Sequence, residues 1–240
     1  MITSIFLDTV LPVIPGMKTL DDFIVKNYYS DVPVSADWIS GYYWDQVNPR
    51  IAANSINPAS SGVVIGAPIR NADSVTFSPS AYIDTQMKMP AKLTVAMTFK
   101  RPATNPAFVF SDYSGTGSTA TGFAIGISSS GGVAAFQDSG AAVIPVPAGI
   151  AVGDMLGVTA YIRDTTISVS VYNPATDTII TGYGNPPVAR TAGTRTALVG
   201  RKFDNNGANS VSARTLLVAN GDIGPAANHL SVIKYLLAKH

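Results

Sequence analysis

The chain has 240 residues, a mass of 25.0 kDa and a formal net charge of +1, and only 13% of its residues are charged. It contains fifteen Asp but no Glu, no Cys and two His, which excludes a disulfide scaffold, a cysteine nucleophile, a multi-histidine metal cage and any reaction that needs a glutamate general acid. The length suits one large domain or two small ones, and the near-balanced charge predicts neither nucleic-acid binding nor membrane recruitment.

The N-terminal segment, residues 1–35, is predicted to dock to a partner or to sister subunits, ahead of a domain spanning residues 36–240. Residues 1–16 are apolar, but they lack a basic leader and are interrupted by Asp8 and Pro12, unlike a signal peptide. The apolar run is also shorter than the roughly 20 residues that span a bilayer, so no membrane insertion is expected. The apolar side chains expected to dock are Ile5, Phe6, Leu7, Phe23 and Ile24.

The densest aromatic cluster follows this segment. Sugar-binding sites use exposed rings that stack on apolar sugar faces, with polar side chains around them. The cluster therefore predicts a ligand-binding site, although the same rings could instead plug one end of a β-sandwich. Its residues are Trp38, Tyr42, Tyr43, Trp44, Asp45 and Asn48.

Most of the remaining chain is predicted to form short strands separated by Gly, Ser, Asn, Asp and Pro. Residues 92–100 alternate, with Leu93, Val95, Met97 and Phe99 on one face, as expected for a strand with one apolar side. Many short strands with regular turn signals predict an all-β antiparallel sandwich or barrel. The other predicted strands are 74–77, 81–85, 107–112, 122–127, 133–137, 155–162, 166–172, 178–182, 198–201 and 211–219.

Helices are expected to be scarce. The strongest candidate is Ser231–Lys239, with Ser231 as the N-cap. A weaker helix is expected over Leu20–Tyr28, where Asp21 and Asp22 would complement the helix dipole. His229 is expected at the surface or at the entry to the C-terminal helix.

The order of these features resembles the concanavalin A-like jelly roll of the laminin-G type, over residues 36–240. The resemblance implies an all-β antiparallel sandwich with a short C-terminal helix, and residues 1–35 have no counterpart in it. The segments that carry it are residues 38–45, residues 74–77 with 81–84, the long strand 93–99, the hairpin 155–162 with 166–173, Leu198-Val199-Gly200-Arg201, the closing strand 214–219 and Leu230-Ser231 before the last helix.

Glycanases of this fold use a closely spaced pair of acidic residues, which the resemblance would place on one strand. This chain has no Glu, and Asp21-Asp22, its one adjacent acidic pair, lies in the segment without a counterpart. A Gly-x-Ser-x-Gly motif is also absent, and Ser114–Gly122 is typical of a flexible loop. We therefore expect a protein without enzymatic activity.

Laminin-G-like folds often bind calcium through Asp and carbonyl oxygens at a loop rim, so the resemblance implies a possible structural calcium and no other cofactor. The preferred ligands are Asp204, Asn205 and Asn206, with Asp112, Asp138 and Asp164 as further candidates. The Asp-Asn-Asn-Gly run is equally typical of a turn without a metal.

A composition rich in Ala, Thr, Ser, Gly and Asn with few charges is one that we associate with bacteriophage virion proteins. The leading hypothesis is a non-enzymatic tail or receptor-binding protein of a virion, assembled in the host cytoplasm, whose sandwich attaches to a host-surface glycan or to other virion proteins. A homo-oligomer is expected, with a trimer as the preferred state. The alternatives are a capsid decoration protein that binds only virion subunits, and a divergent carbohydrate-active enzyme.

Overall fold

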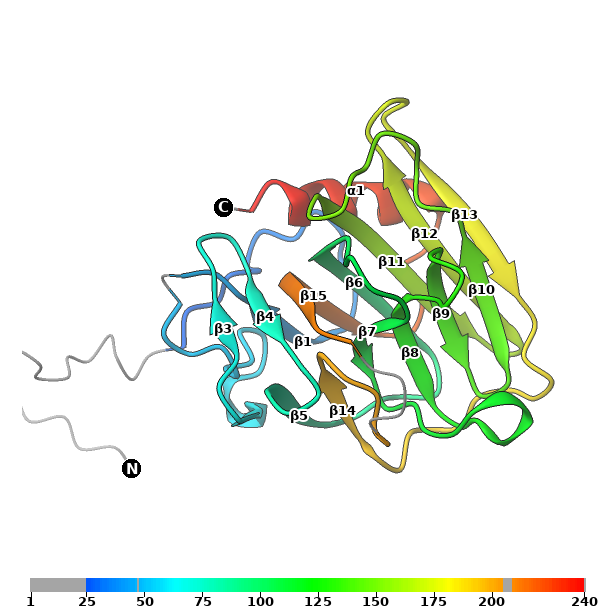
Figure 1. Cartoon of the computed structure of the whole chain (residues 1–240), viewed down its shortest axis with the longest axis horizontal. Helices are drawn as coiled ribbons and strands as arrows, with labels where there is room; N and C mark the ends of the chain where they lie inside the picture. Colours follow the sequence, from blue (N-terminus) through cyan, green and yellow to red (C-terminus); the bar gives the residue numbers. More distant parts are fainter. Residues whose placement is uncertain (1–24, 47, 205–208, 240) are drawn as a thin grey trace, which may run out of the picture.

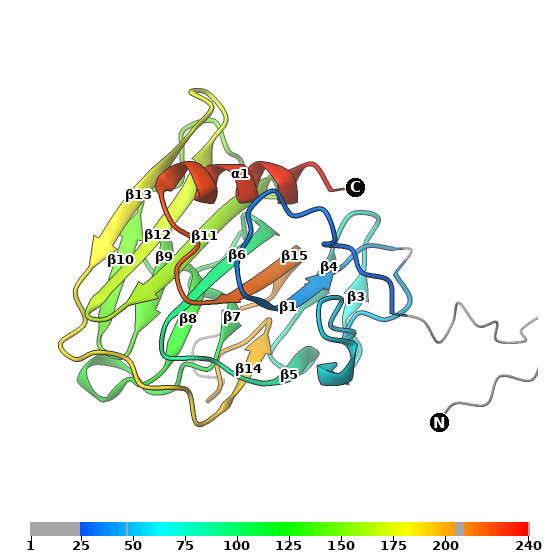
Figure 2. The same cartoon turned by 180° about the vertical axis from the view of Figure 1, so that it is seen from behind.

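The computed structural model of the chain describes residues 25–46, 48–204 and 209–239. Two antiparallel β-sheets stack face to face, and one helix near the C-terminus lies against the outside of the first sheet (Figures 1 and 2). This confirms the predicted all-β sandwich with a short C-terminal helix.

The first sheet has the strand order β13-β12-β11-β6-β15-β4-β3, and β1 also pairs with β15. Short turns join β11 to β12 and β12 to β13, so these three strands are sequential neighbours at one edge. The strand bounds are Thr178–Gly184 (β13), Thr166–Asn173 (β12), Met155–Arg163 (β11), Leu93–Lys100 (β6), Val211–Asn220 (β15), Val75–Phe77 (β4), Ile69–Arg70 (β3) and Trp38–Tyr43 (β1).

The second sheet has the order β10-β9-β8-β7-β14-β5-β2. The predicted hairpin of β8 and β9 is confirmed, and it continues into β10, which the sequence analysis missed together with the short edge strands β2 and β3. The bounds are Gly140–Ile144 (β10), Val133–Gln137 (β9), Phe123–Ile127 (β8), Ala107–Ser111 (β7), Thr196–Val199 (β14), Tyr82–Lys88 (β5) and Val63–Ile65 (β2), with 3-10 turns at Pro58–Ser60 (η2) and Gly117–Thr119 (η3).

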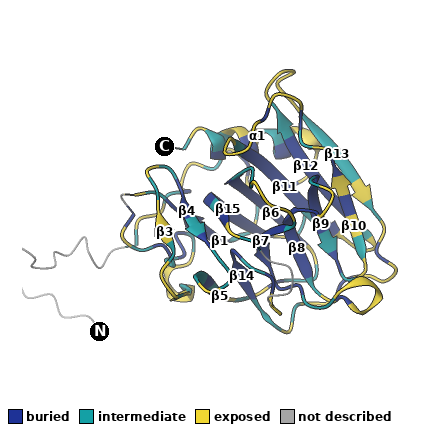
Figure 3. Ribbon diagram, viewed as in Figure 1, coloured by how far each residue is buried: buried dark blue, intermediate teal, exposed yellow. Residues whose placement is uncertain are grey.

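The main hydrophobic core lies between the two sheets. The alternation predicted for β6 is confirmed, because Leu93, Val95, Met97 and Phe99 all belong to this core. The opposite side of β6 is nevertheless also buried, which the alternation did not predict, and Figure 3 shows the central strands as buried ribbons. Something must therefore cover the outer face of the first sheet.

Two segments provide that cover. Helix α1 (Ala226–Leu237) contacts β11 and β6, and the residues around Tyr29 and Val34 pack beside it against β15. In Figure 2 the helix and this N-terminal stretch lie side by side over the sheet. The contact with β11 is close: a Cβ atom on Gly157 would lie only 2.5 Å from the Cγ2 atom of Ile233. Part of the 1–35 segment thus packs on the sandwich, while the expected boundary at residue 35 stays a prediction.

Both helix predictions need correction. Helix α1 begins at Ala226, five residues before Ser231, and Pro225 occupies the N-cap position. Ser231 lies inside the helix, where its hydroxyl donates to the carbonyl oxygen of Ala227 at 2.9 Å. Of the expected helix over residues 20–28, the described part is coil up to residue 27 and a turn from Tyr28. Within the described ranges, no helix is long and apolar enough to cross a membrane.

Candidate functional site

Two of the predicted ligand-binding rings lie inside the sandwich core. Tyr42 and Trp44 are fully buried, and their rings stack at a centroid distance of 5.8 Å. The indole nitrogen of Trp44 donates to the carbonyl oxygen of Ile51 at 2.7 Å, and Phe77 packs edge-on at 5.3 Å. The prediction that Tyr42 and Trp44 stack on a sugar is therefore wrong, because the alternation of β1, which continues into Trp44 just after the strand, turns both rings toward the second sheet.

Trp38 and Asn48 are also held by the protein itself. The Trp38 indole donates to the carbonyl oxygen of Val34 at 3.0 Å, within the cluster that covers the outer face of the first sheet. Asn48 is buried, and its side-chain amide donates to the carbonyl oxygen of Tyr43 at 2.6 Å. These contacts give both residues structural roles.

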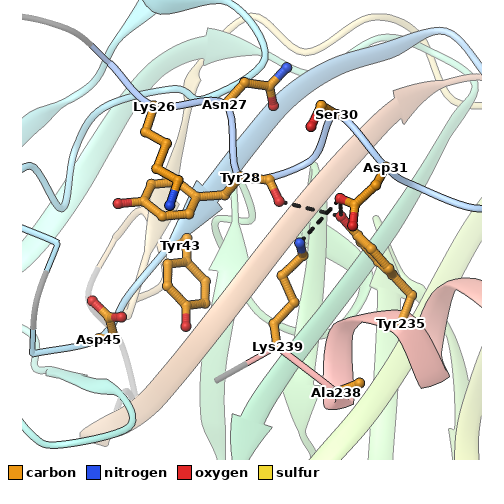
Figure 4. A pocket seen from close by; sticks show the side chains of 10 residues that line it. All are labelled: Lys26, Asn27, Tyr28, Ser30, Asp31, Tyr43, Asp45, Tyr235, Ala238 and Lys239. Carbon is orange, nitrogen blue, oxygen red and sulfur yellow. Dashed lines mark hydrogen bonds and ion pairs between the residues drawn. The ribbon is translucent and has the colours of Figure 1, made fainter.

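The two remaining predicted residues, Tyr43 and Asp45, do line an open hollow of about 760 Å³ at the C-terminal end of α1, here called the lysine–tyrosine pocket (Figure 4). Tyr43 points to the outer face of the first sheet, opposite to Tyr42. The other lining residues are Lys26, Asn27, Tyr28, Ser30, Asp31, Tyr235, Ala238 and Lys239.

The ring faces in this pocket are already occupied. Tyr28 packs on Tyr43 at a centroid distance of 4.8 Å, and the Lys26 ammonium lies 5.1 Å from the centre of the Tyr28 ring. The Lys239 ammonium lies 4.4 Å from the centre of the Tyr235 ring. The pocket therefore offers polar and charged groups rather than open aromatic faces.

A second hollow, of about 390 Å³, lies on the same outer face at the N-terminal end of α1. Tyr161 of β11 and Tyr183 of β13 both stand opposite Ser168 of β12 in the strand register, so the two rings flank the middle strand. Tyr183 is 65% exposed and Tyr161 is half-buried. We call this hollow the tyrosine groove; its lining includes Tyr161, Arg163, Ser170, Thr181, Tyr183, Asp222 and His229.

A chain of polar contacts forms one side of the tyrosine groove. Arg163 and Asp222 form an ion pair at 3.3 Å, and the other Asp222 oxygen lies 3.6 Å from Nε2 of His229. The Nδ1 atom of His229 contacts the hydroxyl of Thr159 at 3.1 Å. The Arg163 guanidinium also lies 5.8 Å from the centre of the Tyr161 ring. These contacts fix donors and acceptors beside the two rings.

His229 was expected at the surface or at the entry to the C-terminal helix. It lies in the first turn of α1, as the second alternative has it, but its side chain is only 3% exposed. Helix α1 begins before it, so the imidazole is placed between the helix and β11 and packs 5.4 Å from the Tyr161 ring. Burial lowers the pKa of His229, and the nearby Asp222 carboxylate opposes that shift. The ring is therefore neutral near pH 7 and can both donate and accept a hydrogen bond.

The sequence analysis missed the tyrosine groove, although a signal for it exists. Tyr161 occupies a position in β11 that alternates with buried apolar residues, and Tyr183 stands between Gly182 and Gly184. Both patterns are consistent with a tyrosine whose ring projects from the face of the strand that does not meet the second sheet. Only the pairing of β11, β12 and β13 shows that the two rings belong to one site.

The calcium prediction receives no support from its described ligand. Asp204 accepts a hydrogen bond from the backbone N–H of Gly115 at 2.7 Å and lies 3.3 Å from the Lys202 ammonium, so a cationic side chain already neutralises it. Asn205 and Asn206 lie outside the described residues, and among the described ones no three His, Cys, Asp or Glu side chains group as metal ligands do.

The other calcium candidates also have protein partners. Asp112 forms a buried ion pair with Arg190 at 2.8 Å, and Asp164 pairs with Lys92 at 2.8 Å. Asp138 accepts a hydrogen bond from the backbone N–H of Gly122 at 2.8 Å. The predicted docking residues Ile5, Phe6, Leu7, Phe23 and Ile24 lie outside the described residues.

No family model matches the chain, and neither does any curated protein sequence. Solved structures do. Domain 4 of AbnA, an extracellular GH43 arabinanase from Geobacillus stearothermophilus in complex with arabinotriose, is similar with a TM-score of 0.58 and 12% identity, over 82% of this chain and 98% of that one.

Longer enzyme chains share the fold as well. A Trypanosoma rangeli sialidase mutant with trans-sialidase activity has a TM-score of 0.54 and 10% identity, over 90% of this chain and 37% of that one. A GH54 α-L-arabinofuranosidase has a TM-score of 0.50 and 12% identity, over 74% and 44%. This chain therefore spans less than half of either enzyme. At these identities the similarity establishes the antiparallel β-sandwich fold alone.

These neighbours correct one prediction. We expected a protein without enzymatic activity, on the view that a sandwich of this kind only binds partners. The solved structures with a similar sandwich, however, come from an arabinanase, a sialidase and an arabinofuranosidase. The prediction is therefore wrong as an inference from the fold, and the fold leaves the question of catalysis open.

Proposed function

We propose that this protein binds carbohydrate in the tyrosine groove. The observation that carries the proposal is the exposed ring of Tyr183, set across β12 from Tyr161. Strands β11 and β13, which carry the two rings, are separated by two strand spacings because β12 lies between them, which corresponds to roughly 10 Å. An exposed tyrosine offers an apolar face to the C–H side of a sugar, and a ring half-held by the sheet loses little conformational entropy on binding.

The polar side of the groove supplies the other half of sugar recognition. The Asp222 carboxylate can accept hydrogen bonds from sugar hydroxyls and Arg163 can donate them, while the buried His229 lies behind Asp222 and helps to position it. Their mutual contacts hold them in place before a ligand arrives. The Arg163 charge is balanced by Asp222, so the groove suits an uncharged sugar. The similar arabinanase domain, which was solved with arabinotriose, supports a carbohydrate ligand at the level of the fold.

Calorimetric titration with arabinotriose, followed by a glycan array, tests the proposal. Tyr183→Ala and Tyr161→Ala should each weaken binding about fivefold or more, since truncating an aromatic anchor commonly costs more than about 1 kcal/mol. Tyr82→Ala is the matched control, because Tyr82 is a half-buried tyrosine on β5 of the second sheet. Binding that survives both groove variants, or the absence of any glycan ligand, would contradict the proposal.

The biological setting that we propose is a bacteriophage virion, in which the sandwich presents this groove to a host-surface glycan as part of a tail or receptor-binding protein. The support is compositional: few charges and many small polar residues. Residues 1–35 would mediate docking and homo-oligomerisation, with a trimer as the preferred state. Deleting residues 1–24, which retains Tyr28 and Tyr29 in the cluster that covers the first sheet, should then yield a monomer by analytical ultracentrifugation, and mass spectrometry of purified particles should detect the chain.

One observation favours the second candidate, a capsid decoration protein that binds other virion subunits. Three large apolar side chains on the edge strands β2 and β3 are exposed: Val63 by 52%, Val64 by 40% and Ile69 by 64%. Exposed apolar residues on sheet edges suit contacts with another protein. Replacing Val64 and Ile69 by Lys should abolish virion attachment if this candidate is right, and leave glycan binding intact.

A further inference from the structure

The tyrosine groove contains a buried imidazole next to its acidic side chain. The His229 side chain is 3% exposed, and its Nδ1 atom contacts the Thr159 hydroxyl at 3.1 Å. The other ring nitrogen, Nε2, faces the Asp222 carboxylate at 3.6 Å, which is longer than a normal hydrogen bond. The contact between the neutral ring and Asp222 is therefore loose, and a positive charge on the ring would strengthen it.

Asp222 connects this imidazole to the surface of the groove. Its Oδ2 atom pairs with Arg163 at 3.3 Å, while its Oδ1 atom faces His229 and accepts from the backbone N–H of Gly224 at 3.0 Å. The side chains of Asp222 and Arg163 are 20% and 57% exposed, so a ligand can reach both of them. The same carboxylate thus serves a buried imidazole on one side and an exposed guanidinium on the other.

Asp222 is the charged group that faces the imidazole. From β11, Tyr161 packs on the ring at a centroid distance of 5.4 Å, and Arg163 lies beyond Asp222; from β13, Tyr183 lines the same groove. Helix α1 has no acidic residue in its first turn, and its Lys234 is paired with an acid of the β12–β13 turn. A proton on the ring would therefore be balanced by Asp222. The neighbouring outward positions on β6 and β12 are Thr94, Ser168 and Ser170, which are not ionisable.

The composition leaves few side chains that can change charge in mildly acidic solution. The chain has no Glu and no Cys, and aspartates ordinarily titrate near pH 3.9, below this range. The two histidines, His229 and His240, are the side chains that ordinarily titrate between about pH 7.5 and about pH 5. Because burial lowers the pKa of His229, its ring takes up a proton only as the pH falls below the usual histidine value of roughly 6.5.

We infer that protonation of His229 is a switch that weakens sugar binding in the tyrosine groove. The charged ring would draw the Asp222 carboxylate toward itself, away from Arg163 and from the hydroxyls of a bound sugar. A sugar that excludes water from the groove would in turn disfavour the charged ring. Protonation and binding therefore oppose each other, so the affinity is highest near neutral pH and falls as the pH drops. The inference rests on the sugar site proposed above and adds its regulation.

Nuclear magnetic resonance of the ligand-free chain tests the structural part of the switch. In a titration from about pH 7.5 to about pH 5, the ring signals of His229 and the guanidinium signal of Arg163 should shift with one common midpoint, because Asp222 moves between the two groups. Asp222→Asn should remove the shift at Arg163. An Arg163 signal that does not respond when His229 titrates would overturn the inference, whether or not a sugar binds.

Calorimetric titration with arabinotriose at both ends of this pH range tests the functional part. The affinity should be about fivefold lower at the acidic end, which is the lower limit of the usual coupling between two sites. Near the midpoint, binding should release protons, which appears as a heat that depends on the ionisation enthalpy of the buffer. His229→Gln, which is neutral throughout, should bind equally at both ends. His240→Gln is the matched control and should keep the pH dependence.

The outcomes separate the switch from the site on which it acts. Equal affinity of the unmodified chain at both pH values, or a pH dependence that persists in His229→Gln, would overturn the inference and leave the sugar site intact. The absence of arabinotriose binding at either pH would count against the proposed function and the inference together. Asp222→Asn is a second variant, outside the buried ring, and should also remove the pH dependence. Circular dichroism at both pH values checks that each chain is folded.

Discussion

Two pairs of aromatic residues associated with the first sheet differ in whether their rings are buried or exposed. Tyr42 and Trp44, at the end of β1, are fully buried between the sheets, whereas Tyr161 and Tyr183 lie on the outer face with Tyr183 65% exposed. The sequence analysis assigned ligand binding to the first group because its rings are dense. The comparison teaches that density of aromatic residues marks a core as readily as a site, and that exposure on a rigid sheet distinguishes the two.

The covering elements explain the difference. The inner face of β1 meets the second sheet, so its rings fill the core. On the outer face, α1 lies over β11 and β6, and the residues around Tyr29 lie beside it. Toward β13 the outer face is less covered, as the half-buried and exposed residues of that strand show in Figure 3. A tyrosine there remains available to a ligand.

The largest expected effect comes from the buried group. Trp44→Ala should lower the free energy of unfolding by about 3–5 kcal/mol, because it removes a large core ring and leaves a cavity. Tyr183→Ala should change it by only about 0.5 kcal/mol or less, as is usual for a surface substitution. Urea denaturation of both variants measures the contrast. Similar losses in the two variants would show that Tyr183 is part of the structural core as well.

An intermediate effect is expected where α1 meets the sheet. Gly157→Ala would place a Cβ atom 2.5 Å from Cγ2 of Ile233 and 2.9 Å from Cδ1 of Leu237, so these side chains or the helix that carries them must shift. Overpacking of this kind typically costs about 1–3 kcal/mol. Because α1 borders the tyrosine groove, ligand binding there should weaken as well. Adding Ile233→Val should restore part of the stability, and no rescue would indicate that the strain lies elsewhere.

The smallest effect concerns His229 and pH. Its pKa in the folded protein is lowered by burial, so the unfolded chain binds a proton more readily. The contribution of His229 to the free energy of unfolding is fully present above its pKa in the unfolded chain, roughly 6.5. This contribution is lost as the pH falls toward and through the lower pKa that His229 has in the folded protein. Denaturation between pH 7 and pH 5 should therefore show falling stability. His229→Gln should flatten this dependence while His240→Gln does not; an unchanged profile in His229→Gln would refute the assignment.

The sequence by itself determined the class of fold and most of the strands. The alternation of Leu93, Val95, Met97 and Phe99 specifies which side of β6 is apolar, and the turn residues between β8 and β9 specify a hairpin. These signals are local, since a strand of period two and a tight turn are encoded by neighbouring residues. They were sufficient to predict an antiparallel sandwich with a C-terminal helix.

The tertiary structure alone decided which rings a ligand can reach. The alternation of side chains along a strand predicts that Tyr42 and Tyr43 point to opposite faces of the sheet. It does not predict which of these faces packs on the second sheet and which packs on α1. Tyr161 and Tyr183 are 22 positions apart in the sequence and become partners in one groove only through the registers of β12 with its two neighbours. Strand pairing and the docking of a helix are long-range contacts, and no local pattern of residues encodes them.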